Sequence, residues 1–126
     1  MAESDADQAA REAQARRHLL RAGAASLPRP PWRHRSQPPS AIDLIQFALA
    51  HADPGGEGEE GMLAALTLLP AARAEVDQLE AGLLFAARSA GLSWPRIARA
   101  LGFASAQAAQ QRYDRVSGRV ENRGAR

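Results

Sequence analysis

The side chains best suited to chemistry lie between residues 93 and 115, and they are amides, hydroxyls and guanidinium groups. A glutamine amide both donates and accepts hydrogen bonds, and a guanidinium donates several at once to an anionic group. These amides and guanidinium groups are suited to recognising a partner through hydrogen bonds. The candidate binding residues are Ser93, Arg96, Arg99, Ser105, Gln107, Gln110, Gln111, Arg112 and Arg115.

Catalytic and metal-binding patterns are not found in the sequence. There is no cysteine, which excludes a thiolate metal site and a cysteine nucleophile. His18, His34 and His51 are far apart, with no carboxylates at ligand spacing beside them, so we expect no metal and no other cofactor. No phosphate loop or nucleophile elbow occurs either. We therefore predict that the chain is not an enzyme and has no small-molecule substrate.

Charge is segregated along the chain. All 16 basic residues are arginine, as a very GC-rich genome tends to produce. Residues 1–39 carry net +3, residues 40–83 carry −7, and residues 84–126 carry +6, with eight arginines against two acids. A basic C-terminal part beside an acidic middle favours a polyanionic partner for the basic part.

The elements that must position the candidate residues begin with a short helix. Ser93 is a strong helix cap, and Pro95 is well placed in the first turn, where its missing N–H costs nothing. Ile97, Ala98 and Leu101 are predicted to face inward. Gly102 should end this helix after about two turns.

A second helix is predicted over 106–116. Phe103 should turn inward, and Ser105 should cap the helix, with Ala109, Tyr113 and Val116 on its inner face. The opposite side then exposes the glutamines, Arg112 and Arg115. A short helix, a tight turn and a second helix are the plan of a helix-turn-helix, expected here at about 92–116. The basic surface continues through Arg119, Arg123 and Arg126.

Upstream, the composition favours an all-α chain, because no alternation of β-branched residues occurs. A polar helix over 5–22 has an alanine face and is expected to be flexible. Residues 27–39 contain five prolines and read as a linker, either a spacer or a basic arm built on Arg29, Arg33 and Arg35 around Trp32. We predict a flexible segment 1–39, one helical domain over 40–118 and a basic disordered tail over 119–126.

The middle of the chain predicts three helices. Ser40 should cap a helix over 41–52, an acidic glycine-rich loop follows at 53–61, and short helix 62–69 leads to Pro70, which either kinks the chain or opens the helix 71–90. Gly91 should end that long helix. Residues 41–69 either pack onto this long helix and complete a single domain or form a homodimer interface, and Val76, Leu79 and Leu83 of its apolar stripe could serve either purpose. The stripe consists of Ala72, Val76, Leu79, Leu83, Ala87 and Ala90, widened by Leu84 and Phe85.

The string GLSWPRIARALG resembles the opening of sigma-factor region-four-like helix-turn-helix domains. The longer string LGFASAQAAQQRY is similar to the recognition helix of small actinobacterial helix-turn-helix DNA-binding proteins. The resemblance covers about residues 70–117. Ala104 departs from the sigma pattern as an inserted residue in the turn, which argues against a true sigma factor. The resemblance implies binding to DNA.

Two functions follow as hypotheses. The first is a sequence-preferring binder of double-stranded DNA, either a transcriptional regulator or a nucleoid-associated protein, with the helix 106–116 in the major groove. The alternative is an adaptor of helix-turn-helix fold that contacts RNA polymerase or another regulator. The sequence has no signal-peptide pattern and no apolar run that could span a membrane, so we expect a cytoplasmic protein located at the nucleoid.

Overall fold

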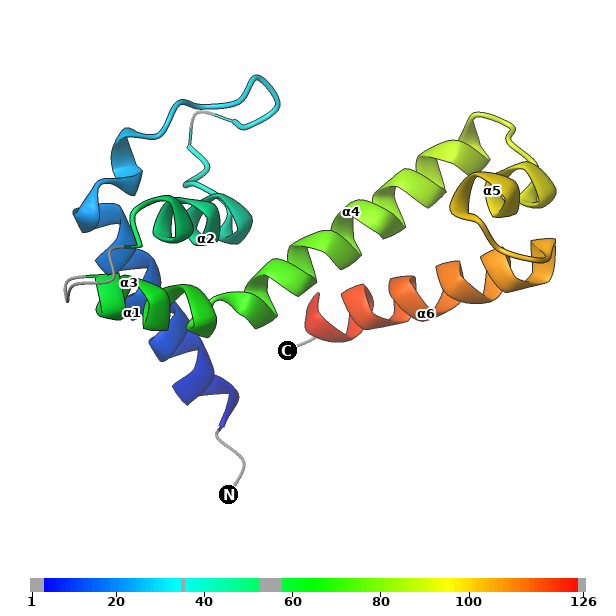
Figure 1. Cartoon of the computed structure of the whole chain (residues 1–126). Coiled ribbons are helices and arrows are strands. Elements are labelled where there is room, and N and C mark those ends of the chain that lie inside the picture. The colour runs from blue at the N-terminus through cyan, green and yellow to red at the C-terminus, as the bar shows by residue number, and fades with distance from the viewer. Residues whose placement is uncertain (1–3, 35, 53–57, 125–126) are drawn as a thin grey trace. The chain divides into compact units, whose positions relative to one another are not determined.

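A computed structural model describes residues 4–34, 36–52 and 58–124, and over these residues the chain is helical with no strand (Figure 1). The all-α prediction is confirmed. The elements are α1 (Asp5–Ala22), the short 3-10 helix η1 (Ala24–Ser26), α2 (Ala41–Ala50), α3 (Gly58–Thr67), α4 (Leu69–Ser89), α5 (Trp94–Leu101) and α6 (Ala106–Gly124).

The chain forms two compact units, residues 1–73 and 74–126. This division differs from the expected boundary after residue 39, because the N-terminal helix is part of a packed core. Ser4 caps α1 by accepting a hydrogen bond from the Asp7 N–H, and Gly23 ends it with a positive φ. The expectation of a flexible helix over 5–22 was therefore wrong.

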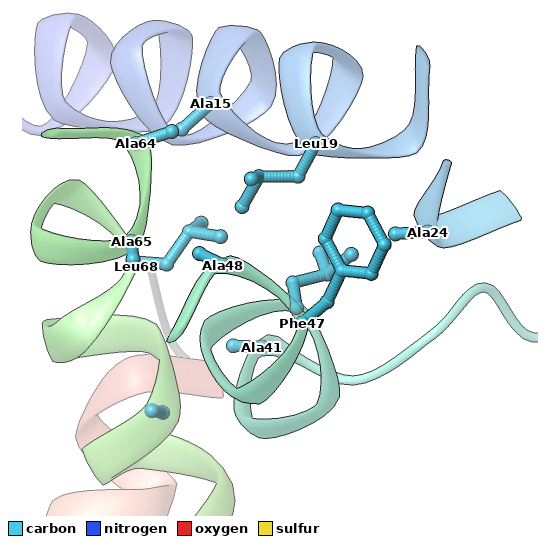
Figure 2. Packing of buried hydrophobic residues seen from close by; sticks show 11 residues of the cluster. Ala15, Leu19, Ala24, Ala41, Phe47, Ala48, Ala64, Ala65 and Leu68 are labelled. Atoms are coloured by element: carbon cyan, nitrogen blue, oxygen red, sulfur yellow. The ribbon is translucent and has the colours of Figure 1, made fainter. Parts of the chain in front are cut away.

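The core of the N-terminal unit explains why α1 is held (Figure 2). Leu19 of α1, Leu44 of α2 and Leu68 are fully buried, and small alanines such as Ala15 and Ala64 surround them. An alanine face buries little area by itself. It does let helices approach closely, so that a single leucine from each segment fills the interior. Arg16 adds a hydrogen bond from its Nη1 to the Pro39 carbonyl, at 3.1 Å.

Local signals place the start of α2 as predicted, but not that of α3. The Ser40 hydroxyl accepts from the Asp43 N–H at 3.0 Å and starts α2, which ends at Ala50, two residues earlier than expected. The predicted acidic loop over 53–61 lies partly outside the described residues, and its last four residues, 58–61, are helical instead. They open α3, which covers Gly58–Thr67 where a helix over 62–69 was predicted. Pro70 is the second residue of α4, so it opens a helix and does not kink one.

The C-terminal unit contains most of α4 together with α5 and α6. Gly91 has φ of +90°, and the Leu92 N–H donates to the Ala87 carbonyl, which closes the end of α4 as predicted. Leu84, Ile97, Ala98 and Ala109 form its buried cluster. The core is small, and a small domain buries a smaller fraction of its surface than a larger one does.

The predicted disordered tail is instead helical. α6 continues through residues 119–124, and two arginines in this stretch pair with Asp77 of α4. The sequence shows the arginines but not their partner, which lies about 40 residues earlier in the chain. Arg126 lies outside the described residues.

Candidate functional site

The two serines of the predicted motif start the two helices that follow them. The Ser93 hydroxyl accepts from the Arg96 N–H at 3.3 Å, and the Ser105 hydroxyl accepts from the Ala108 N–H at 3.1 Å. Each one satisfies a backbone donor that has no partner within its own helix. Both serines therefore position the site, which is a different role from contacting a ligand.

The connection between α5 and α6 is short and turns on one glycine. Gly102 adopts a left-handed conformation with φ of +79°, and the Phe103 N–H donates to the Ala98 carbonyl at 2.8 Å. A residue with a Cβ is strained in this conformation. The turn allows Ala109 of α6 to reach the cluster that holds Ile97.

Two residues expected inside are at the surface. Leu101 is 42% exposed and Phe103 is 37% exposed. Neither side chain belongs to the buried cluster of Leu84, Ile97, Ala98 and Ala109 or packs against it. The prediction of an inward-facing Leu101 and Phe103 was wrong, and both now border the outer surface of the turn.

Most of the candidate binding side chains do share an outward face. Gln107, Gln110, Gln111 and Arg115 are exposed on α6, while Ala109 and Val116 are buried on its other side. Residues three and four apart lie on one face of a helix, so these four side chains form a continuous polar patch. The predicted direction of the glutamines is confirmed.

Arg96 and Arg99 of α5 are also exposed, beside the turn that leads to α6. Neither they nor Arg115 form an ion pair with any residue that the structure describes. These three guanidinium groups are therefore available to an anionic partner.

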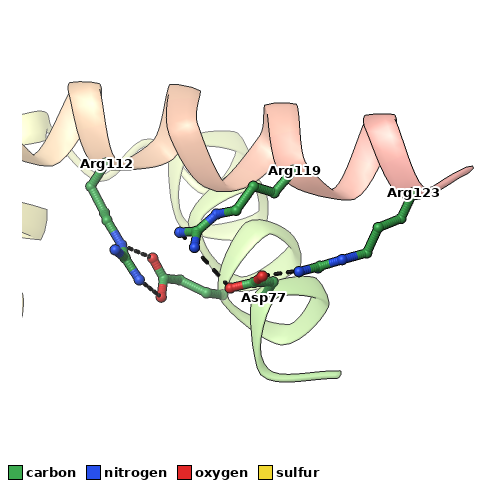
Figure 3. A network of polar contacts seen from close by, with 5 residues as sticks. Asp77, Arg112, Arg119 and Arg123 are labelled. Atoms are coloured by element: carbon green, nitrogen blue, oxygen red, sulfur yellow. Dashed lines mark hydrogen bonds and ion pairs between the residues drawn. The ribbon is translucent and has the colours of Figure 1, made fainter. Parts of the chain in front are cut away.

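Arg112 departs from the prediction. It faces α4 and holds the Glu80 carboxylate with two parallel hydrogen bonds, one of them 2.9 Å from Nη2 to Oε1 (Figure 3). The hydrogen bond from Arg112 lowers the pKa of Glu80, and the carboxylate in turn raises the pKa of the guanidinium. Arg112 is therefore a structural residue and is not available as a candidate ligand contact.

Arg119 and Arg123 likewise point towards α4, where they share Asp77 (Figure 3). Arg123 Nη1 lies 2.9 Å from Asp77 Oδ2, and Arg119 Nη2 lies 3.9 Å from Oδ1. The Asp77 side chain is only 10% exposed, so both pairings also compensate for its burial. Asp77 carries one negative charge, so it neutralises one of these two arginines, and the basic extension predicted from the sequence keeps part of its charge.

The net charge of the C-terminal unit is lower than that of residues 84–126, because the unit also includes acidic residues of α4. Residues 74–126 contain eight arginines and five acidic residues, net +3, whereas residues 84–126 alone carry +6. The difference is the acidic side of α4, from Glu75 to Glu80. Among the described residues of the unit, the exposed arginines without an acidic partner are Arg96 and Arg99 on α5, Arg115 on α6 and Arg88 in the last turn of α4.

Two further features lie near the site. Trp94 packs between the Arg88 guanidinium, 5.0 Å from its ring centroid, and the Tyr113 ring, 5.9 Å away. Such contacts fix the start of α5 against α6. Asp114 is exposed among the glutamines of α6, and its exposure could have been read from the same helical spacing.

The proline-rich segment lies in the N-terminal unit. Trp32 is 85% exposed, Arg29 is exposed and Arg33 is half-buried, while Arg35 lies outside the described residues. The Arg33 N–H donates to the Pro30 carbonyl at 3.0 Å, so the segment contains a tight turn and is not extended throughout.

Comparison with protein-family models, with curated proteins and with solved structures found no match. Among the described residues, no helix has the length and apolar character needed to cross a membrane. Over the same residues, no group of three or more histidines and acids is arranged to hold a metal ion.

Proposed function

We propose that this chain binds double-stranded DNA with a sequence preference, as a transcriptional regulator or a nucleoid-associated protein. In this proposal α5, the turn at Gly102 and α6 act as a helix-turn-helix. The observation that carries it is the outward face of α6, where Gln107, Gln110, Gln111 and Arg115 stand exposed directly after a short capped helix and a tight turn. That face suits insertion into a major groove.

The roles of the side chains follow from their chemistry. The glutamines hydrogen-bond to base edges, with adenine as the preferred partner of a paired amide contact. Arg96 and Arg99 bind the phosphates that flank the groove, and these contacts give affinity without sequence preference. Ser93, Ser105 and Arg112 hold the helices in place.

The test is a gel shift with the full chain on genomic fragments at several salt concentrations. We expect binding that weakens as salt rises, because phosphate contacts release counterions. Replacing Arg115 with alanine should weaken binding to every fragment. Arg17→Ala is the matched control, since Arg17 is an exposed arginine of α1 in the other unit. No binding at any salt concentration would reject the proposal.

Replacement of Gln107 or Gln110 by alanine separates base contacts from phosphate contacts. We expect these variants to lose preference for the bound fragment over random DNA, while affinity for random DNA changes little. Equal losses on both kinds of DNA would contradict the role given to the glutamines.

A homodimer is part of the same proposal, because two copies would place two helix-turn-helix elements on one stretch of DNA. The exposed face of α4 is its interface: Val76, Leu79 and Leu83 are 49, 69 and 71% exposed. Gly82 lies beside them in mid-helix, and a Cβ there would meet nothing within 4 Å. A helix-interior glycine costs about 1 kcal/mol relative to alanine. Close approach of a second helix would account for it.

A second candidate function rests on the same apolar face. If a different protein covers it, the chain is an adaptor that contacts RNA polymerase or another regulator. Sedimentation of the purified chain separates the two: a dimer that Leu79→Ser converts to a monomer supports the interface between copies. A monomer at tens of micromolar that is also inert in gel shift, but recovers RNA polymerase in a pull-down, supports the adaptor.

A further inference from the structure

The outer face of α6 carries one acid among its amides. Asp114 is exposed, three residues after Gln111 and four after Gln110, so the three side chains are neighbours on one face. The residue four positions later, where a cation would balance it, is Gly118. Asp114 makes no hydrogen bond or ion pair with the residues that the structure describes.

Two acids of α4 face α6 and, unlike Asp114, have ion-pair partners. Glu80 and Asp77 of α4 are each paired with arginines of α6 (Figure 3). Asp114 has no such role in packing, and it is the ninth residue of α6, too far from the helix start to benefit from the helix dipole. Aspartate is also a weak helix former. Folding of the unit therefore gives no reason for an acid at this position.

For a surface that binds DNA, a bare carboxylate is unfavourable unless it meets a hydrogen-bond donor, because it repels the phosphates. The only base-edge group in the major groove that offers donors without an adjacent acceptor on the same base is the cytosine N4 amine, and carboxylates accept from it. Adenine also presents a donor, but glutamine and asparagine suit its donor and acceptor pair better.

From these observations we infer that Asp114 is a specificity-determining residue that selects cytosine in the bound site. The inference rests on the proposed function and adds to it the identity of one base. Asp114 accepts a hydrogen bond from the cytosine amine, while Gln110 and Gln111 read neighbouring bases from the preceding turn of the same helix.

The experiment is selection of bound duplexes from a library with a randomised central segment, using the full chain and three variants. Asp114→Ala removes the acceptor, and Asp114→Asn replaces it with an amide that suits adenine. Glu121→Ala is the matched control, since Glu121 is an exposed acid of α6, seven residues or about 10 Å further along the helix. Circular dichroism checks that each variant keeps its helices.

For the unchanged chain we expect cytosine to dominate at one position of the selected site. D114A should lose that preference by about fivefold or more, while binding random duplex more tightly, because one repulsive charge is gone. D114N should shift the same position towards adenine. Glu121→Ala should keep the preference for cytosine and raise the affinity for all duplexes alike.

Each result decides the matter. If D114A and D114N select the same sites as the unchanged chain, the inference is wrong while DNA binding stands. If D114A and Glu121→Ala behave alike, Asp114 contributes only charge, and the inference is again wrong. If the unchanged chain recovers no duplex at all, the proposed function fails with it.

Discussion

Replacing Glu80 with glutamine tests whether the contact between α4 and α6 depends on paired charge. The substitution keeps the size of the side chain and one acceptor, and it removes the charge that Arg112 holds with two hydrogen bonds. The side chains are 23 and 33% exposed, so the pair is between the surface and buried cases. Exposed pairs contribute about 0–1 kcal/mol and hydrogen bonds to charged groups about 1.5–3. We expect a loss of about 1–2 kcal/mol in the free energy of unfolding.

Thermal and urea unfolding followed by far-UV circular dichroism would measure this loss. For a small domain, a loss of 1 kcal/mol shifts the Tm by about 4–8 °C, so the expected destabilisation is large enough to measure. Glu121→Gln is the control, because Glu121 is an exposed acid of α6, and a surface change of this kind should stay within about 0.5 kcal/mol.

A double-mutant cycle identifies the source of the loss. Combined with Arg112→Gln, the change at Glu80 should cost less than it does alone, because its partner is already absent. If E80Q is as stable as the unchanged chain, or if its cost is the same with Arg or Gln at position 112, the pair does not hold α6 and the reasoning fails.

Further outcomes follow from single features. Arg112 lowers the pKa of Glu80 in the folded chain, so the pair stabilises the fold fully above the ordinary glutamate pKa of about 4.3. This stabilisation is lost as pH falls through the lowered pKa. The stability of E80Q should therefore depend less on pH in acid unfolding. Gly102→Ala should destabilise by about 1–2 kcal/mol in urea unfolding, because φ is +79° there, and equal stability would contradict a strained turn. Arg115→Ala should reduce the slope of log affinity against log salt by about 1 in gel shifts, and an unchanged slope would exclude a phosphate contact. Leu83→Asp should abolish any self-association seen in sedimentation, since Leu83 is 71% exposed on α4.

The features that the sequence predicted well are those decided within a few residues. Ser40 and Ser93 cap helices as expected, and Gly91 and Gly102 take positive φ at helix ends. Each depends on a hydrogen bond or a backbone conformation that the local chain alone determines. The direction of the glutamines followed for the same reason, from the spacing of the buried Ala109.

The features that the sequence did not predict depend on distant partners. Arginine is a residue type that often contacts a ligand, but Arg112 donates hydrogen bonds to Glu80, 32 residues earlier. α1 was expected to be flexible because its face is mostly alanine, yet Leu19 is buried in the core that α1 forms with α2 and α3. Helical periodicity gives the face on which a residue lies, but not what lies against it.

The two tryptophans of the chain lie in different units and differ in burial: Trp32 is exposed and Trp94 is partly buried. Trp32 is 85% exposed in the N-terminal unit, and Trp94 packs against Tyr113 in the C-terminal unit. Emission from Trp32 should resemble that of the unfolded chain and change little on denaturation. The change in intrinsic fluorescence on unfolding therefore reports the packing of α5 against α6. A Trp32→Phe variant would let unfolding of the C-terminal unit be followed alone, without any added label.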